Sequence, residues 1–188
     1  MADVSITIDE VGLRVRFASW RLENLKEVMS VNVTRNRFGE RLQLMQEFFF
    51  HLVGAREVLA LLINERRGLD HDPEKISIGQ IFKSLKADDS IYSMVRELVV
   101  DPRREPFPTD PYTESAYIYR AVLYRNQVAH RHRTPLHIEV EFPYERKSFL
   151  YLDPRNYDVG HSKIEAIEEL SVMRDRLLNR YVRIGNAL

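Results

Sequence analysis

Apolar residues recur at helical spacing over most of the chain and predict a mainly α protein. The strongest pattern spans residues 38–66, where apolar positions repeat at i, i+3, i+4 and i+7 and form a broad stripe. Gly68 follows this segment, and glycine is the usual residue just after a helix end. A helix with so broad an apolar face is expected to be central and packed on two sides.

The N-terminal pattern differs. Apolar and polar residues alternate over residues 3–17, which is typical of two short strands around Asp9–Gly12, or of one strand followed by the start of a helix. A short helix is expected over Ser19–Met29. We therefore predict a short N-terminal β element followed by helix.

The middle of the chain contains two short helix signals and a proline-rich break. Ser77 and Gln80 form a capping box that begins a helix, and Asp88 or Asp89 can cap a second helix over about residues 91–99. The segment Asp101–Pro111 holds four prolines and cannot be regular structure. We expect it to be an exposed loop.

The last third of the chain predicts helix, hairpin and helix. A helix begins at residues 110–113 and runs to about Arg131. Alternating residues then predict a small β-hairpin at about 136–152. A second capping box, Ser162–Glu165, predicts the start of the final helix.

These elements predict one domain over residues 1–188 with a helical core of about 19–184. Its expected fold is an α-helical bundle of four or five main helices, with the hairpin at 136–152 and the short N-terminal β element as additions.

Composition removes several classes of protein. The chain has no cysteine, which excludes disulfide scaffolds, cysteine-ligated metal sites and cysteine nucleophiles. Lys and Arg together number 28 and so do Asp and Glu, so a global polyanion-binding surface is not indicated. No apolar run approaches the roughly 20 residues of a membrane-spanning helix. The acidic start lacks the features of a signal peptide, and a soluble cytoplasmic protein is expected.

The candidate chemistry lies in residues 117–133. On a helical wheel, Arg125 falls within about 20° of Ile118, in the middle of an apolar stripe. An arginine there is costly unless something pairs with it. Asn126 and His130 are four residues apart on a neighbouring face, so the three side chains are expected to converge. No acidic residue occurs from Ser115 to Ile138, which makes this a local positive patch in a neutral chain.

The segment Arg125-Asn126-Gln127-Val128-Ala129-His130 resembles the signature of HEPN domains, in which an Arg and a polar residue, often Asn, precede a His by a few positions. The resemblance implies a helical bundle that dimerises so that two signatures face each other across a cleft. Many members of that family are metal-independent ribonucleases of toxin–antitoxin and phage-defence systems. An antitoxin protein is then a further partner.

For this chain the resemblance implies an endoribonuclease that cuts RNA by attack of the 2′-hydroxyl. His130 has the residue type suited to acid–base catalysis, and Arg125 offers forked donors to phosphoryl oxygens. Asn126 can orient the imidazole or the substrate, and no metal or other cofactor is expected. The residues expected to bind RNA around them are basic or histidine: Arg120, Arg131, His132 and Arg133. Arg103 and Arg104 in the proline-rich loop can extend this basic path.

Two alternatives stay open. Other HEPN domains have lost catalysis and serve as dimeric binding or scaffold modules, and the helix pattern is the same under both hypotheses. A metal site built from His130, His132 and His137 is the weaker alternative, since no carboxylate lies near these histidines before Glu139.

Overall fold

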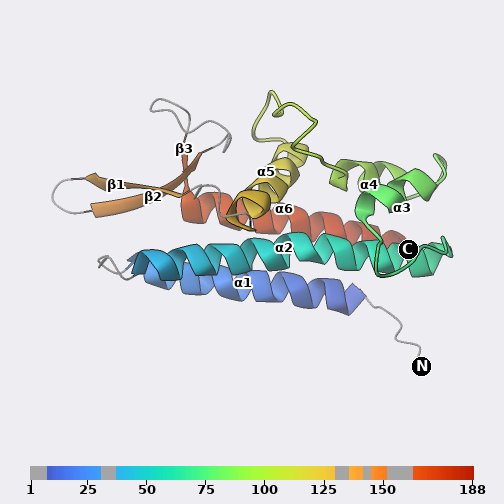
Figure 1. Ribbon diagram of the computed structural model, residues 1–188, viewed down its shortest axis with the longest axis horizontal. Helices are drawn as coiled ribbons and strands as arrows, with labels where there is room; N and C mark the ends of the chain where they lie inside the picture. Colours follow the sequence, from blue (N-terminus) through green and yellow to red (C-terminus); the bar gives the residue numbers. More distant parts are fainter. Residues whose placement is uncertain (1–7, 31–36, 130–135, 142–144, 152–162) are drawn as a thin grey trace.

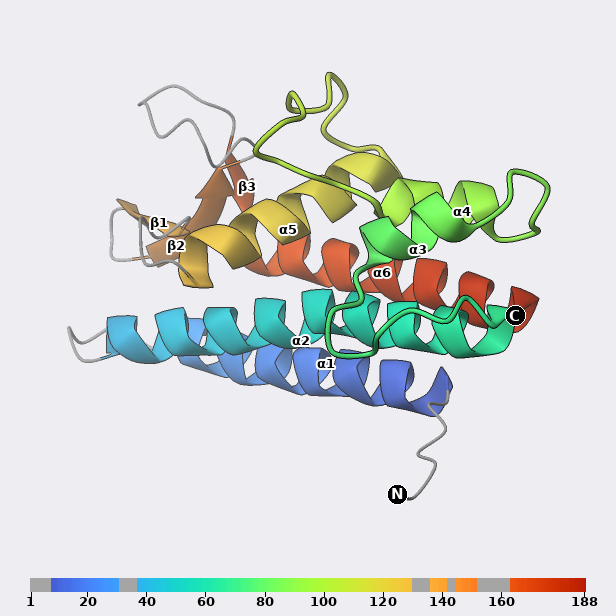
Figure 2. The same cartoon turned by 45° about the vertical axis from the view of Figure 1, so that its right-hand side comes forward.

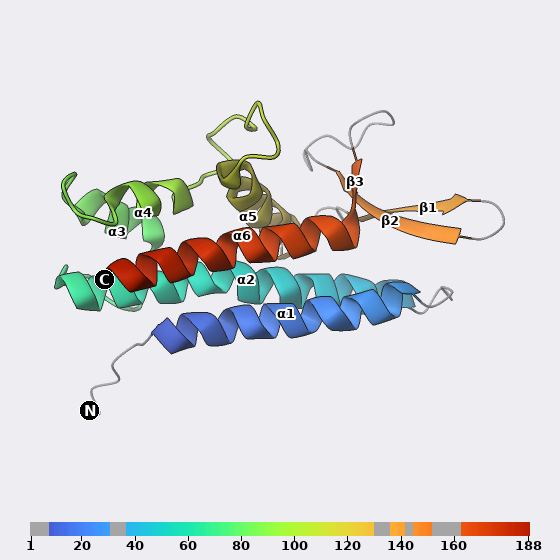
Figure 3. The same cartoon turned by 180° about the vertical axis from the view of Figure 1, so that it is seen from behind.

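Three long helices pack together, and a fourth helix crosses them. In this computed structural model, which describes residues 8–30, 37–129, 136–141, 145–151 and 163–188, the long helices are α1 (Ile8–Ser30), α2 (Arg37–Arg67) and α6 (Ala166–Ala187). Helix α5 (Glu114–Ala129) packs on α2 and α6, and the three ribbon views place it on the side away from α1 (Figures 1, 2 and 3). The predicted mainly α fold is confirmed.

The long helix predicted over residues 38–66 is confirmed as α2, one residue longer at each end. Its apolar residues face α1, α5 and α6 at once, and Phe48, Phe49 and Leu52 have no exposed surface. Gly68 follows α2 with φ of 58°, the left-handed conformation that glycine adopts at a helix end. α2 is therefore the central element against which the other long helices pack.

The two short helices are also present. α3 (Ile78–Ser84) begins after Ser77, whose side chain accepts a hydrogen bond from the Gln80 backbone N–H, as the capping box predicts. α4 (Tyr92–Leu98) has Ile91 as its N-cap, with no side-chain cap hydrogen bond, so the prediction that Asp88 or Asp89 caps this helix is wrong. Asp89 accepts from the Ile91 backbone N–H at 3.0 Å and also binds Arg67 of α2 at 2.9 Å, so it fixes the start of α4 to the central helix.

The hairpin is confirmed and gains a third strand. β1 (Leu136–Glu141) pairs antiparallel with β2 (Glu145–Tyr151), and β2 pairs antiparallel with β3 (Lys163–Glu165). The prediction that residues 163–165 open the last helix is therefore wrong. The edge of β2 is available for pairing, with Leu150 opposite Ile164, and α6 begins only after Glu165, whose carboxylate accepts from two backbone N–H groups of its first turn. Ser162 lies outside the described residues.

The predicted N-terminal β element is wrong from residue 8 onward, because Ile8–Ser30 is one continuous helix. Residues 1–7 lie outside the described residues. The core face of α1 carries Val11, Val15, Ala18, Leu22 and Leu25 at helical spacing. Leu13 and Phe17 are apolar but exposed on the opposite side, and together with Val15 they produce the alternation that suggested a strand.

His51 joins α1 to α2 between two aromatic rings and provides a test of this packing. Its ring centroid lies 5.2 Å from Phe17 and 5.4 Å from Phe50. Burial lowers the pKa of His51 below its ordinary 6.5, Arg14 and Arg21 lower it further, and Glu47 opposes them.

Because the folded state disfavours the protonated imidazole, His51 stabilises the fold above pH 6.5, and this contribution is lost as the pH falls. We expect acidification from pH 7 to pH 5 to reduce the free energy of unfolding more for the wild type than for His51→Gln, measured by urea denaturation. Parallel pH curves for the two proteins would show that His51 does not carry this dependence.

Candidate functional site

Helix α5 is buried on all sides over its middle. Nine consecutive residues, 116–124, have no more than 9% of their surface exposed. Tyr124 is fully buried, its hydroxyl donates to the Tyr151 carbonyl of β2, and its ring lies 5.4 Å from that of Phe49. The second half of α5 is therefore held by both α2 and the sheet.

Arg125 is the first exposed residue after this buried run, and its Nη1 donates to Asn126 Oδ1 at 3.2 Å. The expectation that Arg125 lies within the buried apolar stripe is wrong. Ile118 and Val122 of that stripe are buried, but beyond Tyr124 only the face that carries Val128 stays buried, so the stripe reaches solvent at Arg125. Arg125 therefore keeps its charge in water and needs no buried partner.

The prediction that Arg120 binds RNA is also wrong. Its side chain has no exposed surface, and its Nε donates to Glu169 Oε1 of α6 at 2.6 Å. A second nitrogen, Nη1, donates to the Pro111 carbonyl, and the guanidinium lies 4.4 Å from the centre of the Tyr117 ring. Arg120 makes only these internal contacts and has no surface accessible to a ligand.

Burial raises the pKa of the Glu169 carboxyl above its ordinary value, against the opposing attraction of Arg120. Within the described residues, Glu169 Oε2 and Arg120 Nη2 are buried without a hydrogen-bond partner. The pair is therefore a tight contact between two buried ions, and it joins α5 to α6.

A second charged cluster joins the start of α5 to α6 and α4. Arg180 is buried, its Nε donates to Glu114 Oε1 at 2.8 Å, and it also forms an ion pair with Glu97. Sequence reasoning missed both clusters. The available signal was the position of Glu169 and Arg180 on the apolar stripe of α6, among Ala166, Leu170, Met173, Leu177, Tyr181 and Ile184.

The described structure brings together only two of the three predicted catalytic residues, Arg125 and Asn126. His130 follows the last residue of α5, and it lies outside the described residues, as do Arg131, His132 and Arg133. The Gln46 side chain donates to the Val128 carbonyl at 3.3 Å, which fixes the last turn before His130. In the described ranges, no three side chains of the metal-ligating types lie close enough together to hold an ion.

The proline-rich loop lies against the first half of α5 and is irregular, as predicted. The Tyr119 hydroxyl donates to the Glu105 carbonyl at 3.0 Å, and the Phe107 ring meets the Tyr119 ring edge-on at 5.6 Å. Arg103 and Arg104 are exposed. The loop is therefore attached to α5 well before the turn that carries Arg125.

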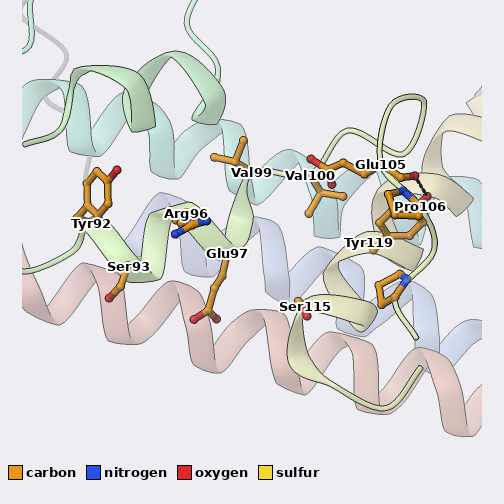
Figure 4. A pocket seen from close by; sticks show the side chains of 11 residues that line it. Tyr92, Ser93, Arg96, Glu97, Val99, Val100, Glu105, Pro106, Ser115 and Tyr119 are labelled. Carbon is orange, nitrogen blue, oxygen red and sulfur yellow. Dashed lines mark hydrogen bonds between the residues drawn. The ribbon is translucent and has the colours of Figure 1, made fainter. Parts of the chain in front are cut away.

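A pocket of about 570 Å³ opens between this loop, α4 and α5 (Figure 4). Ser115 and Tyr119 line it from the α5 face that also carries Asn126. Its charged residues are mixed: Arg96 and Glu97 come from α4 and Glu105 from the loop, with Glu97 already bound to Arg180. With Glu97 neutralised by Arg180, Arg96 and Glu105 remain as one positive and one negative charge, so the pocket has no net positive charge to attract a phosphate and is distinct from the Arg125–Asn126 pair.

Comparisons of the chain with models of protein families, with curated proteins and with solved structures give no match in any of the three. Over the described ranges, no helix has both the length and the apolar character needed to cross a membrane.

The buried Arg120–Glu169 pair makes a stability prediction. Glu169→Gln leaves the Arg120 charge buried without a counter-ion, so we expect the free energy of unfolding to fall by about 3–5 kcal/mol in urea denaturation. The double variant Arg120→Met/Glu169→Leu removes both charges and should recover most of that loss. Arg104→Ala, which removes an exposed ion pair with Asp101 in the proline-rich loop, is the control and should change stability by less than about 1 kcal/mol. A Glu169→Gln protein as stable as the wild type would show that the pair does not hold α5.

Proposed function

We propose that this chain is a metal-independent endoribonuclease in which Arg125, Asn126 and His130 act on the RNA phosphodiester. The observation that carries the proposal is the Arg125–Asn126 pair. It is on an exposed turn at the end of an otherwise buried helix, and Arg125 forms no ion pair with any described carboxylate. A guanidinium group that is held on a rigid helix and open to solvent can form two parallel hydrogen bonds to a phosphate.

Arg125 supplies the electrostatic part of the mechanism. One of its nitrogens is held by Asn126 Oδ1, and the remaining N–H donors are free to reach two phosphoryl oxygens at once. Attack of the 2′-hydroxyl puts additional negative charge on those oxygens in the transition state. Donors already in position stabilise that charge without reorganising. The Asn126 amide NH₂ stays available to orient the substrate or the imidazole.

His130 supplies the proton transfers. The 2′-hydroxyl must lose a proton as it attacks phosphorus, and the departing 5′-oxygen must gain one. An imidazole with a pKa near 6.5 can serve in either role at neutral pH. The products are a 2′,3′-cyclic phosphate on one fragment and a 5′-hydroxyl on the other.

The same pair also fits a binding module that holds RNA without cutting it. The burial of Arg120 favours this second candidate, since it removes one cation from the patch that was expected to surround the site. The two candidates make different predictions for RNA that carries a 2′-hydroxyl, because only the nuclease converts it into shorter products.

For His130, we expect wild-type protein to cleave single-stranded RNA in EDTA and to leave a 2′,3′-cyclic phosphate or the derived 3′-phosphate. His130→Ala should lower the cleavage rate about 10²–10⁴-fold, since it removes one acid–base group. His71→Ala, in a loop far from α5 along the chain, is the matched control and should cleave as the wild type does. Cleavage that stops in EDTA and returns with a divalent ion would contradict the proposal, as would binding without cleavage.

For Arg125, we expect Arg125→Ala to reduce cleavage about 10²–10³-fold, and Arg125→Lys to recover only part of it, because an ammonium cannot reproduce the fork. Thermal unfolding should be nearly unchanged, since the side chain is exposed. Arg183→Ala, another exposed arginine, is the control. Equal rates for the Arg125 variants and the wild type would exclude a catalytic role for this residue.

A further inference from the structure

The outer surface of the α1–α2 pair carries a cluster of exposed apolar side chains, which we call the aromatic face: Leu13, Phe17, Trp20 and Phe50. Their exposed fractions are 43%, 39%, 55% and 57%, and they are four of the seven large apolar side chains exposed among the described residues. The first three follow one another along α1 at i, i+4 and i+7, so they form a single stripe.

The aromatic face is continuous and well supported. The His51 ring connects Phe17 to Phe50, with centroids 5.2 and 5.4 Å away. The Arg14 guanidinium lies 5.7 Å from the centre of the Phe50 ring, and that of Arg21 lies 4.6 Å from the Trp20 ring. These contacts hold the rings in place before any partner arrives, so little conformational entropy would be lost on binding.

The size of the aromatic face suits an interface between two proteins. An aromatic side chain offers roughly 150–250 Å², so the exposed fractions leave on the order of 400 Å² of apolar surface open. A standard interface buries about 800 Å² on each partner, and in homodimers about 65% of it is apolar. About 65% of that area is on the order of 500 Å², so the aromatic face supplies most of the apolar surface that a homodimer interface needs, and Arg14 and Arg21 beside its rings can supply part of the polar remainder.

The charges of α1 indicate the kind of partner. The helix carries four acidic residues, Asp9, Glu10, Glu23 and Glu27, and four basic residues, Arg14, Arg16, Arg21 and Lys26. Its net charge is therefore zero, which gives no attraction to nucleic acid or to an anionic membrane. It also gives no net repulsion between two copies of the same surface.

We propose that the aromatic face binds the same face of a second copy of this chain. The stripe is nearly symmetric about Phe17, so a two-fold axis beside that residue sets the two α1 helices antiparallel. Leu13 then packs against the partner's Trp20, and Phe50 lies beside that same ring. This isologous arrangement covers all four side chains at once.

This dimer differs from the one that the HEPN resemblance implies. Helix α5 lies on the side of α2 and α6 away from α1, so pairing through the aromatic face leaves both Arg125–Asn126 pairs on outer surfaces (Figures 1 and 3). The two signatures then do not share one cleft. The proposal does not depend on ribonuclease activity, and its tests measure mass and cross-linking only.

The first test is analytical ultracentrifugation of the full chain at micromolar concentration. We expect a wild-type dimer, and Trp20→Glu/Phe50→Glu should raise the dissociation constant at least 100-fold with unchanged circular dichroism. Tyr112→Glu and Val182→Glu alter exposed apolar residues elsewhere, at 58% and 43% exposure, and should remain dimeric. A monomeric wild type, or a double variant that stays dimeric, overturns the proposal.

The second test uses the absence of cysteine, because one introduced thiol is then the only one in the chain. When two helices pack with their own axes about 8–10 Å apart, residues that face each other at the two-fold axis have Cα atoms close enough for a disulfide, and therefore for a short cross-linker. We expect Phe17→Cys to form covalent dimers with a short bismaleimide and Arg125→Cys to stay monomeric on a denaturing gel. Cross-linking of Arg125→Cys alone would overturn the proposal in favour of facing signatures.

Discussion

The ion pair between Arg120 and Glu169 sets the position of α5, and the candidate site depends on that position. Both side chains are fully buried, so their charges have no water to stabilise them. Each therefore requires the other, and any shift of α5 along α6 would separate them at a large cost in free energy. The same guanidinium binds the Pro111 carbonyl, which ties the end of the proline-rich loop to the same point. Arg180 and Glu114 add a second connection between the two helices at the start of α5. These two ion pairs allow only one position of α5 along α6, whereas apolar packing alone would specify that position less strictly.

The rigidity of α5 has a direct consequence for chemistry at its end. A phosphate-binding group must be held within a fraction of an ångström of its productive position, and loops seldom achieve this. Arg125 comes one residue after Tyr124, which is locked between the Phe49 ring and the Tyr151 carbonyl. The buried part of the helix, residues 116–124, thus provides the support, and the Arg125–Asn126 pair after it presents the donors. We infer that the fold separates these two tasks along one helix.

How far the sequence predicts this structure depends on the kind of residue. The helix at 38–66 and the hairpin at 136–152 were predictable because their apolar periods are long and consistent. The prediction of an N-terminal strand was wrong because Leu13 and Phe17 are apolar residues on a solvent-facing side, and a sequence pattern treats every apolar residue as buried.

The predicted exposures of Arg120 and Arg125 were also wrong: Arg120 was expected at the surface and is buried, and Arg125 was expected in the apolar stripe and is exposed. The helical wheel shows which side a residue faces but not where along the helix the burial ends, and in α5 every side is buried from Ala116 as far as Tyr124. Ion pairs between distant helices leave no local pattern, so the Glu169 partner could not be found from spacing alone.

The chain has 22 arginines and only 6 lysines, and contacts between helices give a structural reason for some of this excess. Arg67 of α2 binds Asp89 and the Ala187 carbonyl at the end of α6, and Arg56 binds the Leu98 carbonyl at the end of α4. Together with Arg120 and Arg180, these side chains use the forked geometry of guanidinium to join helices, a task that a lysine with its single ammonium performs less well. Internal connections thus account for part of the arginine content, and that content is not in itself a sign of nucleic-acid binding. Arg125 is one of the exposed arginines, with Arg16, Arg66 and Arg183, that make none of these helix-joining contacts. It bonds only to its neighbour Asn126, it joins no two elements in the described structure, and its exposed fork is free for a ligand. A neutral protein that binds a polyanion must do so through local features of this kind, since its overall field gives no attraction.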